Sequence, residues 1–447
     1  MPGFDVVIVG GGSAGAVLAA RLSEDPARTV LVLEAGPVYT ADTLPPSIRR
    51  LSQKLLPEHD WAHEAESTGS RIPYTRGRVA GGSSSINATM AFRPVPGDVD
   101  DWGIEGWGWD DLLPHFVAIE HDLDVVAPWH GSAGPLPIVR HGIDALTPTQ
   151  AWFVERALDL GYEQEHDHND PATTGGVGAI PMNRSGHDRV SAADAWLYPA
   201  LGRPNLTVRG DTPVDRVVVR DGRAVAVDAG GEWIDAGEVV LCGGVLQSPA
   251  LLRRSGIDLP GIGENLSDHP SVPVPLSGVS RPDRDAPTIQ TMLRLPSPVT
   301  GRAFDLQLFP TTYGVLYAAP QSVDRRGRVV PLDSGEVRIE WPFLDDERCR
   351  SELRAGVRLA AEFADGDVEL AFDLTDDAAV DDYVRTAHRA FLHGCGTCAM
   401  GTVVDADLRV LGVEGLRVCD TSVIPTVPRA NPNLTVLAVA DRAATRF

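Results

Sequence analysis

The sequence predicts a fold of the α/β class, α+β overall, in which two domains are interleaved along one chain. The first forty residues alternate apolar strand, helix and strand, an order typical of a parallel sheet. Between residues 303 and 341, short strand patterns follow one another without helices, which is typical of an antiparallel sheet. No linker rich in Pro, Gly or Ser separates the two patterns, so we expect segments of both domains to alternate.

Composition limits the classes of protein and partner. The chain has 447 residues, enough for a large core and more than one domain. Acidic side chains outnumber basic ones by 62 to 39, and the formal net charge is −23, so we expect no nucleic acid partner. No apolar run reaches the ~18 residues of a membrane-spanning helix. Five cysteines are too few for a secreted framework of this size. We therefore expect a soluble, cytoplasmic protein with no membrane span.

The most specific local pattern lies near the beginning of the chain. The apolar run Val6–Val9 predicts a buried strand, and Ala16–Leu22 has the pattern of a helix. A second apolar strand, Thr29–Leu33, ends in Glu34. Between the first strand and the helix lies a GxGxxG turn, Gly10-Gly11-Gly12-Ser13-Ala14-Gly15.

This Rossmann-like pattern has a mechanical explanation. The glycines permit a tight turn and let backbone N–H groups at the helix N-terminus approach a pyrophosphate. Glu34 is placed to accept a hydrogen bond from a ribose hydroxyl, which indicates a cofactor without a 2′-phosphate. The motif therefore predicts FAD or NAD without choosing between them. The alternative is an ordinary glycine-rich turn between strand and helix.

The remaining elements follow from apolar spacing. Helical spacing joins Leu112, Phe116 and Ile119, and recurs in an amphipathic stretch, Ser191–Tyr198. Short runs typical of strands or of helices complete the chain. The strands are expected at Leu206–Val208, Val214–Val219, Ala224–Val227, Val239–Leu241, Ala303–Phe309 and Gly335–Trp341, and the helices at Ala250–Arg254, Ser351–Phe363 and in a last segment ending at Arg446.

Two further segments suggest chemistry. Small residues with free N–H groups and hydroxyls, from Gly77 to Asn87, form either an anion-binding nest or a plain loop. Near the C-terminus, His393 stands in a turn of Gly, Cys and Thr and is a candidate base. Taken alone, a hydrogen-bonded core histidine is the commoner explanation.

Together these segments resemble the glucose–methanol–choline (GMC) oxidoreductases, a family of FAD-dependent alcohol oxidases and dehydrogenases. The matching blocks follow the family's order from residue 10 to residue 444. They are GGGSAGAVLAARLSED with LVLEAGP, GRVAGGSSSINATMAF, GVGAIPMNRSGHDRVSAADAWLYPAL with RPNLTV, EVVLCGGVLQSPALLRRSGI, GIGENLSDHP, and HGCGTCAMG with LRVLGVEGLRVCDTSVIPTV and NPNLTVLAVADRAA.

The resemblance implies FAD as the cofactor and assigns residues to it. The ADP half would lie against Gly10, Gly12, Ser13, Ala14, Gly15, Glu34 and Ala35, with the backbone of Val214 at the adenine. The pyrophosphate and flavin would lie along Val79, Gly82, Ser83, Asn87, Ala88, Thr89 and Met90, and Asp420, Asn431 and Pro432 would close over the isoalloxazine. Some relatives attach FAD through a histidine in the glycine cluster, whereas Ile86 stands at that position here. We therefore expect FAD to be noncovalent.

The resemblance also implies a reaction. His393 matches the family's catalytic histidine and Asn431 its partner. The chain would oxidise the CH–OH group of an alcohol to a carbonyl, with His393 as base and hydride transfer to flavin N5. Two alternatives are a flavin-dependent lyase or decarboxylase on the same fold, and a non-catalytic flavoprotein. The retained pair of His393 and Asn431 favours alcohol oxidation, because a decarboxylase has less use for a base directed at a hydroxyl.

Domain boundaries, partners and acceptor follow from the same resemblance. The FAD-binding domain would comprise residues 1–45, 75–140, 205–275 and 385–447. The substrate or cap domain would comprise residues 46–74, 141–204 and 276–384. The stretch between His269 and His393 is short for the family, so a small alcohol, or a bulky one admitted by the trimmed cover, is the expected substrate. The electron acceptor would be O2 or a carrier.

Other residues that could be metal ligands, redox groups or catalytic groups have simpler structural explanations. The pair Cys395 and Cys398 has CxxC spacing, but no second pair completes a zinc site, so packing is favoured over redox chemistry. The run from Glu165 to Asp170 is better explained as a solvated loop than as a set of metal ligands. His269 is expected to be structural. We therefore predict no metal site.

Overall fold

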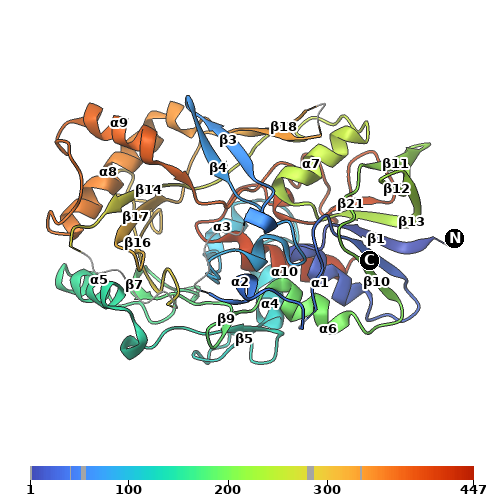
Figure 1. The fold of residues 1–447 in the computed structure, drawn as a ribbon, viewed down its shortest axis with the longest axis horizontal. Coiled ribbons are helices and arrows are strands. Elements are labelled where there is room, and N and C mark those ends of the chain that lie inside the picture. Colours follow the sequence, from blue (N-terminus) through green and yellow to red (C-terminus); the bar gives the residue numbers. More distant parts are fainter. Residues whose placement is uncertain (1–2, 41, 52–56, 279–285, 333–334) are drawn as a thin grey trace.

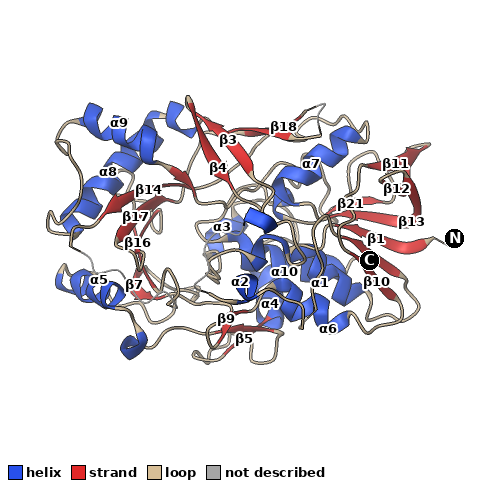
Figure 2. Cartoon of the chain, in the orientation of Figure 1, coloured by secondary structure: helices blue, strands red, loops and turns tan. Residues whose placement is uncertain are grey.

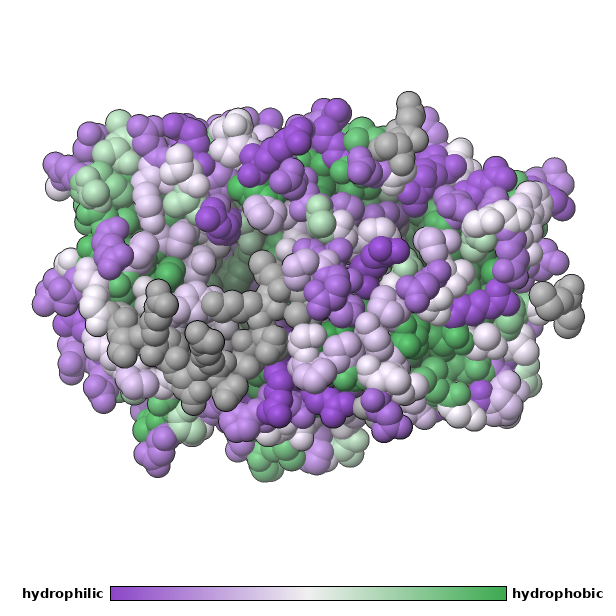
Figure 3. Space-filling view, viewed as in Figure 1, coloured by the Kyte–Doolittle hydropathy of each residue, from purple (hydrophilic) through white to green (hydrophobic). Residues whose placement is uncertain are grey.

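The computed structural model describes residues 3–40, 42–51, 57–278, 286–332 and 335–447. Two sheets lie at opposite ends of an elongated molecule, with helices and loops between them (Figure 1). Both chain termini lie beside the first sheet (Figure 1). On the face seen in Figure 3, hydrophilic side chains (purple) dominate, in keeping with the acidic composition.

The first sheet has a parallel centre in the order β10-β2-β1-β13, with β21 also pairing with β13. The antiparallel strands β12 and β11 extend it at one edge. Central strands are apolar on both faces because both faces are covered. The bounds are β1 Phe4–Val9, β2 Val30–Leu33, β10 Leu206–Arg209, β11 Arg216–Arg220, β12 Arg223–Ala229, β13 Glu232–Leu241 and β21 Leu416–Val418.

Helix α1 (Ser13–Leu22) follows β1 directly and is almost entirely enclosed. Eight of its ten residues are buried, because the helix lies between the sheet and α10 (Pro432–Ala444). Its alanines let α10 approach closely. On its far side α10 packs against α4 (Trp109–Ile119), and a single turn, η4 (Ala193–Leu197), followed by α6 (Tyr198–Ala200), packs against α1.

The second sheet is antiparallel throughout, in the order β20-β14-β17-β16-β15-β7. Helices α5 (Pro148–Asp159) and α8 (Glu347–Phe363) cover one face, and α9 (Asp377–Ala387) lies beside α8 (Figure 2). The strands are β7 Gly176–Ala179, β14 Pro270–Pro275, β15 Thr291–Leu295, β16 Leu306–Pro310, β17 Val315–Pro320 and β20 Arg389–Ala390.

A third, four-stranded sheet bridges the upper side of the molecule in the order β18-β19-β3-β4 (Figure 2). Helix α7 (Gly244–Arg254) packs against β18. The strands are β3 His63–Ser67, β4 Ser70–Tyr74, β18 Arg328–Pro331 and β19 Val337–Glu340. The remaining short elements are α2 Pro46–Arg49, α3 Pro96–Asp100, β5 Glu120–Asp122, β6 Leu136–Ile138, β8 Arg184–Ser185 and β9 Asp188–Arg189.

The predicted fold class is confirmed: a parallel Rossmann-like sheet and an antiparallel sheet share the chain. Two short segments lie elsewhere than their expected domain ranges imply. Both β14 and β20 belong to the antiparallel sheet, although residues 205–275 and 385–447 otherwise supply strands to the parallel sheet. The chain therefore passes between the sheets at these two strands. None of the described helices combines the length and the apolar character needed to cross a membrane.

A buried charge network ties β5 and the loop that follows it to the loop before β7. Glu120 accepts from His130 (Nδ1 to Oε1, 2.6 Å) and pairs with Arg93, and Asp167 accepts from His130 Nε2 at 2.9 Å. Arg140 pairs with Asp167 at 2.8 Å. Among the described residues, Glu120, Asp122 and His130 lie close enough to hold a metal ion. Arg93, Arg140 and His130 pair with these carboxylates, and Oε2 of Glu120 has no hydrogen-bond partner there.

Candidate active site

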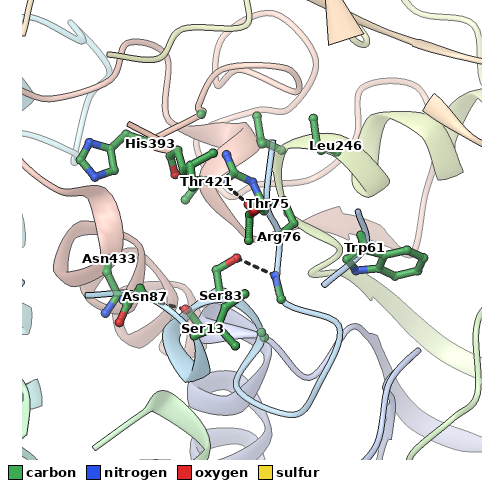
Figure 4. Close-up of a pocket in the computed structure, with 18 of the residues that line it drawn as sticks. Ser13, Trp61, Thr75, Arg76, Ser83, Asn87, Leu246, His393, Thr421 and Asn433 are labelled. Atoms are coloured by element: carbon green, nitrogen blue, oxygen red, sulfur yellow. Dashed lines mark hydrogen bonds between the residues drawn. The ribbon is translucent and has the colours of Figure 1, made fainter. Parts of the chain in front are cut away.

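A cavity of about 1120 Å³ lies between the two main sheets. It exceeds the roughly 300–1,000 Å³ of ordinary small-molecule pockets, and so has room for a dinucleotide together with a substrate. In Figure 4, His393 and Trp61 lie on opposite sides of the cavity, with Ser13 and Ser83 below them. The cavity joins the glycine turn after β1 to the histidine near the C-terminus.

The turn after β1 is shaped by two close backbone approaches. Gly10 has φ +104°, and a Cβ there would lie 2.5 Å from the carbonyl oxygen of Cys242. A Cβ on Gly15 would lie 2.0 Å from the carbonyl oxygen of Gly10. Gly12 differs, because its φ is −72° and a Cβ there would have no protein atom nearer than 3.8 Å. Gly10 and Gly15 are therefore required by the protein itself, whereas Gly12 borders the cavity and a Cβ there would make only ordinary van der Waals contacts.

Glu34 lies at the end of β2 and lines the cavity, where a ribose hydroxyl was expected. Its oxygens also hold the chain in place, since Oε2 accepts from Gly11 N (2.8 Å) and Oε1 from Gly36 N (2.9 Å). Each oxygen retains a second lone pair. Burial raises the pKa of Glu34 to about 7, against the effect of these two hydrogen bonds.

Most residues expected at the cofactor line this one cavity. They are Gly10, Gly12, Ser13, Ala14, Glu34, Ala35, Gly82, Ser83, Asn87, Ala88, Met90, Val214, Asp420, Asn431 and Pro432. Gly15, Val79 and Thr89 do not line it. Gly15 closes the first turn, and Val79 is fully buried in a small apolar cluster with Ile48. Thr89 is buried and has φ +56°.

Other lining residues were not assigned a role from the sequence. Gly243 and Gly244 follow β13, which pairs with β1, so they meet the Gly10 turn at the same edge of the sheet. The glycines after Val239–Leu241 carried that signal, because ligands bind at the carboxyl ends of parallel strands. Trp61 and Arg76 come from an irregular region without a comparable pattern.

His393 is 8% exposed and is held by hydrogen bonds on both ring nitrogens. Nε2 lies 3.0 Å from Nδ2 of Asn431, and Nδ1 lies 2.9 Å from Nδ1 of His269. Asn431 stands at the N-cap of α10, yet its side chain does not cap the helix and instead faces His393. Its Oδ1 is buried without a partner in the described chain.

These contacts fix the tautomer of His393. The amide nitrogen of Asn431 donates, so Nε2 of His393 must present its lone pair. The proton of a neutral His393 then sits on Nδ1 and is donated to Nδ1 of His269. His269, expected to be structural, therefore contacts the candidate base directly. Proximity to His393 could not be read from the sequence, because 124 residues separate the two.

A buried carboxylate supports both histidines. Oδ1 of Asp268 accepts from the backbone N–H groups of His269 and His393, each at 2.7 Å, and Oδ2 accepts from the Tyr74 hydroxyl at 2.5 Å. Burial, the neighbouring His269 and then Arg76 hold the pKa of His393 well below its usual range. The imidazole is therefore neutral at neutral pH and can accept a proton.

The cysteines near this site lack the features of a redox pair. Cys395 and Cys398 are fully buried and unbridged, and burial raises the pKa of both thiols. The Cys395 thiol donates to the carbonyl oxygen of His393 at 3.2 Å. Both side chains pack in the core around the parallel sheet, as expected from the sequence.

The residues present fit a dinucleotide with a reactive ring system. The N-terminus of α1 and the part of the cavity that Gly12 lines suit a pyrophosphate, and Glu34 suits a ribose. The neutral His393 and the unpartnered Oδ1 of Asn431 lie elsewhere in the same cavity. This combination is that of a dinucleotide-dependent oxidoreductase.

Comparison with known proteins identifies the family. The N-terminal and C-terminal models of the GMC oxidoreductase family match residues 4–271 and 324–440. The chain therefore belongs to the GMC oxidoreductases, and it is an FAD flavoprotein of that family.

Relatives match along the whole chain. A GMC-type oxidoreductase of Rhodococcus erythropolis without an assigned reaction is 34% identical, covering 98% of this chain and 97% of the relative. The 5-(hydroxymethyl)furfural oxidase of Methylovorus sp. (strain MP688) is 33% identical, covering 99% and 98%. The crystal structure of pyridoxine 4-oxidase from Mesorbium loti has a TM-score of 0.91 at 30% identity, covering 99% of both chains. The alignment with the furfural oxidase runs over 530 positions, more than this chain has, so that relative carries additional residues.

Proposed function

We propose that this protein oxidises the CH–OH group of an alcohol to a carbonyl, with noncovalently bound FAD and with His393 as base. One observation carries the proposal. The neutral His393 imidazole, with its Nε2 lone pair directed at Asn431, lies in the same cavity as the dinucleotide turn.

His393 and Asn431 have different roles toward the hydroxyl group of the alcohol. An alcohol oxygen that takes the place of the Asn431 amide at Nε2 of His393 meets the lone pair of that nitrogen. Nε2 then takes the hydroxyl proton, a step worth typically ~10²–10⁴ in rate. The Asn431 amide donates to the oxygen as negative charge develops and cannot compete as a base. Bound FAD would supply the hydride acceptor, N5 of its ring system.

The cofactor-binding residues are those that line the cavity from the glycine turn to α10. Gly12, Ser13 and Glu34 would hold the ADP half, and Ser83, Asn87 and Pro432 the flavin half. Ile86 lines the cavity and offers no nucleophile, which supports a noncovalent cofactor. The two sheets would correspond to an FAD-binding domain and a shortened substrate domain.

The relatives support an alcohol as substrate. Their names assign oxidation of 5-(hydroxymethyl)furfural and of pyridoxine, each a hydroxymethyl compound. The acceptor that reoxidises the flavin would be O2 or a carrier, and only a kinetic measurement separates these.

The experiment is flavin bleaching without oxygen. The purified protein is expected to show the visible absorption of bound flavin, released on denaturation, and to lose it when a suitable alcohol is added anaerobically. His393→Ala is expected to slow this reduction by about 10²–10⁴ while FAD stays bound. His166→Ala, at an exposed histidine outside the cavity, serves as the matched control and should reduce at the parent rate.

Each result has a distinct meaning. Rapid return of the colour in air identifies an oxidase, and slow return identifies a dehydrogenase that uses a carrier. Near-normal reduction of the His393→Ala protein would remove His393 from the mechanism. A flavin that no alcohol bleaches would turn attention to lyase chemistry, and a protein unable to take up FAD would defeat the proposal.

A further inference from the structure

The half of the cavity beside the antiparallel sheet has a composition of its own. It is lined by aromatic rings, small hydroxyl side chains and a single cation. The lining residues from this sheet and its connections are Ser271, Pro287, Thr288, Ile289, Phe309, Thr311, Tyr313, Tyr317, Arg389 and Ala390. Among them Arg389 alone carries a charge. On the face shown in Figure 3, the surface is hollowed left of centre, with apolar atoms (green) inside the hollow.

Four rings form a continuous stack that ends at the base. The His393 ring lies 4.4 Å from Phe391, Phe391 lies 5.3 Å from Phe309, and Phe309 lies 5.4 Å from Tyr317. The last two pairs are nearly parallel, with interplanar angles of 13° and 10°. The stack makes an aromatic wall, which offers a further aromatic ring the edge-to-face and offset contacts that a flexible chain cannot make.

Arg389 lies in β20, just before the segment that carries two members of this wall. Arg389, Phe391 and His393 are alternate residues, all three line the cavity, and Leu392 between the last two has φ +68°. Four residue steps separate the Cα atoms of Arg389 and His393, so these lie at most about 14 Å apart. Because both side chains line the cavity, one small ligand can contact His393 and Arg389 together.

The guanidinium of Arg389 has N–H donors available for a ligand. Among its contacts with described residues, Nη1 alone is engaged, donating to the carbonyl oxygens of Ala387 and His388 at 2.8 Å each. Within the described residues no carboxylate lies within salt-bridge distance of Arg389. Its Nε–Nη2 edge is the edge that binds a carboxylate through two parallel hydrogen bonds.

We infer that the preferred substrate is a single-ring aromatic alcohol bearing a carboxylate opposite its hydroxymethyl group, with Arg389 as the specificity-determining residue. This inference rests on the proposed function. The stacked wall selects a flat ring, His393 meets the hydroxyl, and Arg389 meets the negative charge.

The test compares two substrates that differ only in charge, 4-(hydroxymethyl)benzoate and the neutral 4-(hydroxymethyl)benzamide. In anaerobic flavin reduction, the limiting rate divided by the dissociation constant is expected to be about five-fold higher for the acid in the parent enzyme, as for a partly exposed ion pair. Arg389→Gln should bring the ratio of the two values close to one. Arg389→Lys should retain part of the preference, because a point charge cannot reproduce the two-pronged contact.

Arg385→Gln is the matched control. Arg385 lies four residues earlier on α9, pairs with Asp382 at 2.6 Å and does not line the cavity. The Arg385→Gln substitution removes the same charge from the molecule as Arg389→Gln. Because Arg385 does not line the cavity, the acid-to-amide ratio should stay at its parent value. A parent enzyme that treats acid and amide alike, or equal losses in the Arg389 and Arg385 variants, would overturn the inference.

A binding measurement separates this inference from the proposed function. Calorimetric titration of the FAD-loaded protein with 4-methylbenzoate, which has no hydroxyl group to oxidise, should give tighter binding than 4-methylbenzamide in the parent but not in Arg389→Gln. If the acid binds more tightly than the amide but neither alcohol reduces the flavin, the contact between Arg389 and a carboxylate is supported and the proposed alcohol oxidation is wrong. Reduction by both alcohols at equal efficiency would preserve alcohol oxidation and defeat the role of Arg389.

Discussion

The dinucleotide turn and the histidine pair are constructed in opposite ways. The turn uses one short stretch of chain, and its hydrogen bonds join residues such as Gly11 and Glu34, 23 positions apart. The histidine pair joins residues 124 positions apart through one contact between ring nitrogens. A site made from one supersecondary unit carries a sequence pattern, whereas a site made by two distant segments acquires its chemistry only when the sheets pack together.

Within the turn, substitution of some glycines should lower the free energy of unfolding, whereas substitution of others should weaken FAD binding. Gly10→Ala places a Cβ 2.5 Å from the Cys242 carbonyl oxygen at φ +104°, and is expected to cost about 2 kcal/mol or more of unfolding free energy. Gly12→Val should instead weaken FAD binding by about 100-fold, because Gly12 lines the cavity and the branched side chain would enter the part of it beside α1.

Thermal unfolding of the FAD-free protein and FAD titration measure the two effects separately. Gly12→Ala is the control for backbone change, because φ at that position is −72° and the added Cβ meets no atom within 3.8 Å. Its FAD-free melting temperature should match that of the parent. Equal destabilisation by Gly10→Ala and Gly12→Ala would contradict the distinction.

The histidine pair should respond to the loss of its acceptor. His269→Leu removes the acceptor for the Nδ1 proton of His393, and the loss of a buried hydrogen bond, about 1–3 kcal/mol, corresponds to a roughly 10- to 100-fold lower rate of flavin reduction. His269→Asn can place Oδ1 where Nδ1 lies and should recover most of the rate. Equal losses in both variants would show that His269 acts only through packing.

The pH profile tests the charge that surrounds His393. Burial, His269 and Arg76 hold the pKa of His393 below its usual range, so the base is neutral at pH 7 and flavin reduction should decline only in acid. Arg76→Gln removes one positive neighbour, so the pKa of His393 should rise and the acid limb of the profile should move to higher pH. An unmoved limb would remove Arg76 from the electrostatics of the base.

The buried charge network around His130 should have a smaller effect, which changes the pH dependence of stability and leaves the active site unchanged. Burial disfavours a protonated His130, but hydrogen bonds to Asp167 and Glu120 prevail and raise its pKa to about 9. A raised histidine pKa stabilises the fold below the unfolded value near 6.5, and that contribution is lost as the pH rises through 9. The free energy of unfolding should therefore fall by about 2 kcal/mol between pH 6.5 and 9.5. The melting temperature should fall with it.

His130→Gln is the variant that isolates this network. It should have a lower melting temperature at pH 6.5 and a weaker dependence on pH, while its rate of flavin reduction stays at the parent value. An unchanged pH dependence would assign the effect to other groups, among them Glu34 with its pKa of about 7.

The sequence alone determined the features that follow from short-range geometry. Strand, glycine turn, helix and acid predicted the dinucleotide half of the cavity, because a tight turn at a helix N-terminus needs those residues at that spacing. His393 and Asn431 were assigned through the resemblance to the GMC family, and the folded chain places Nε2 of His393 3.0 Å from Nδ2 of Asn431. Even within the motifs, only the packed structure separated Gly12, which borders the cavity, from Gly15, which closes the turn.

The tertiary structure decided what depends on contacts between sheets. The pairing of β14 with β20 aligns Ser271 with Arg389 and brings His269 to His393. The same packing stacks Phe309 and Tyr317 of the antiparallel sheet on Phe391 and sets Arg389 at the cavity. No spacing in the chain records these contacts, because each joins segments whose distance along the sequence does not constrain their distance in space.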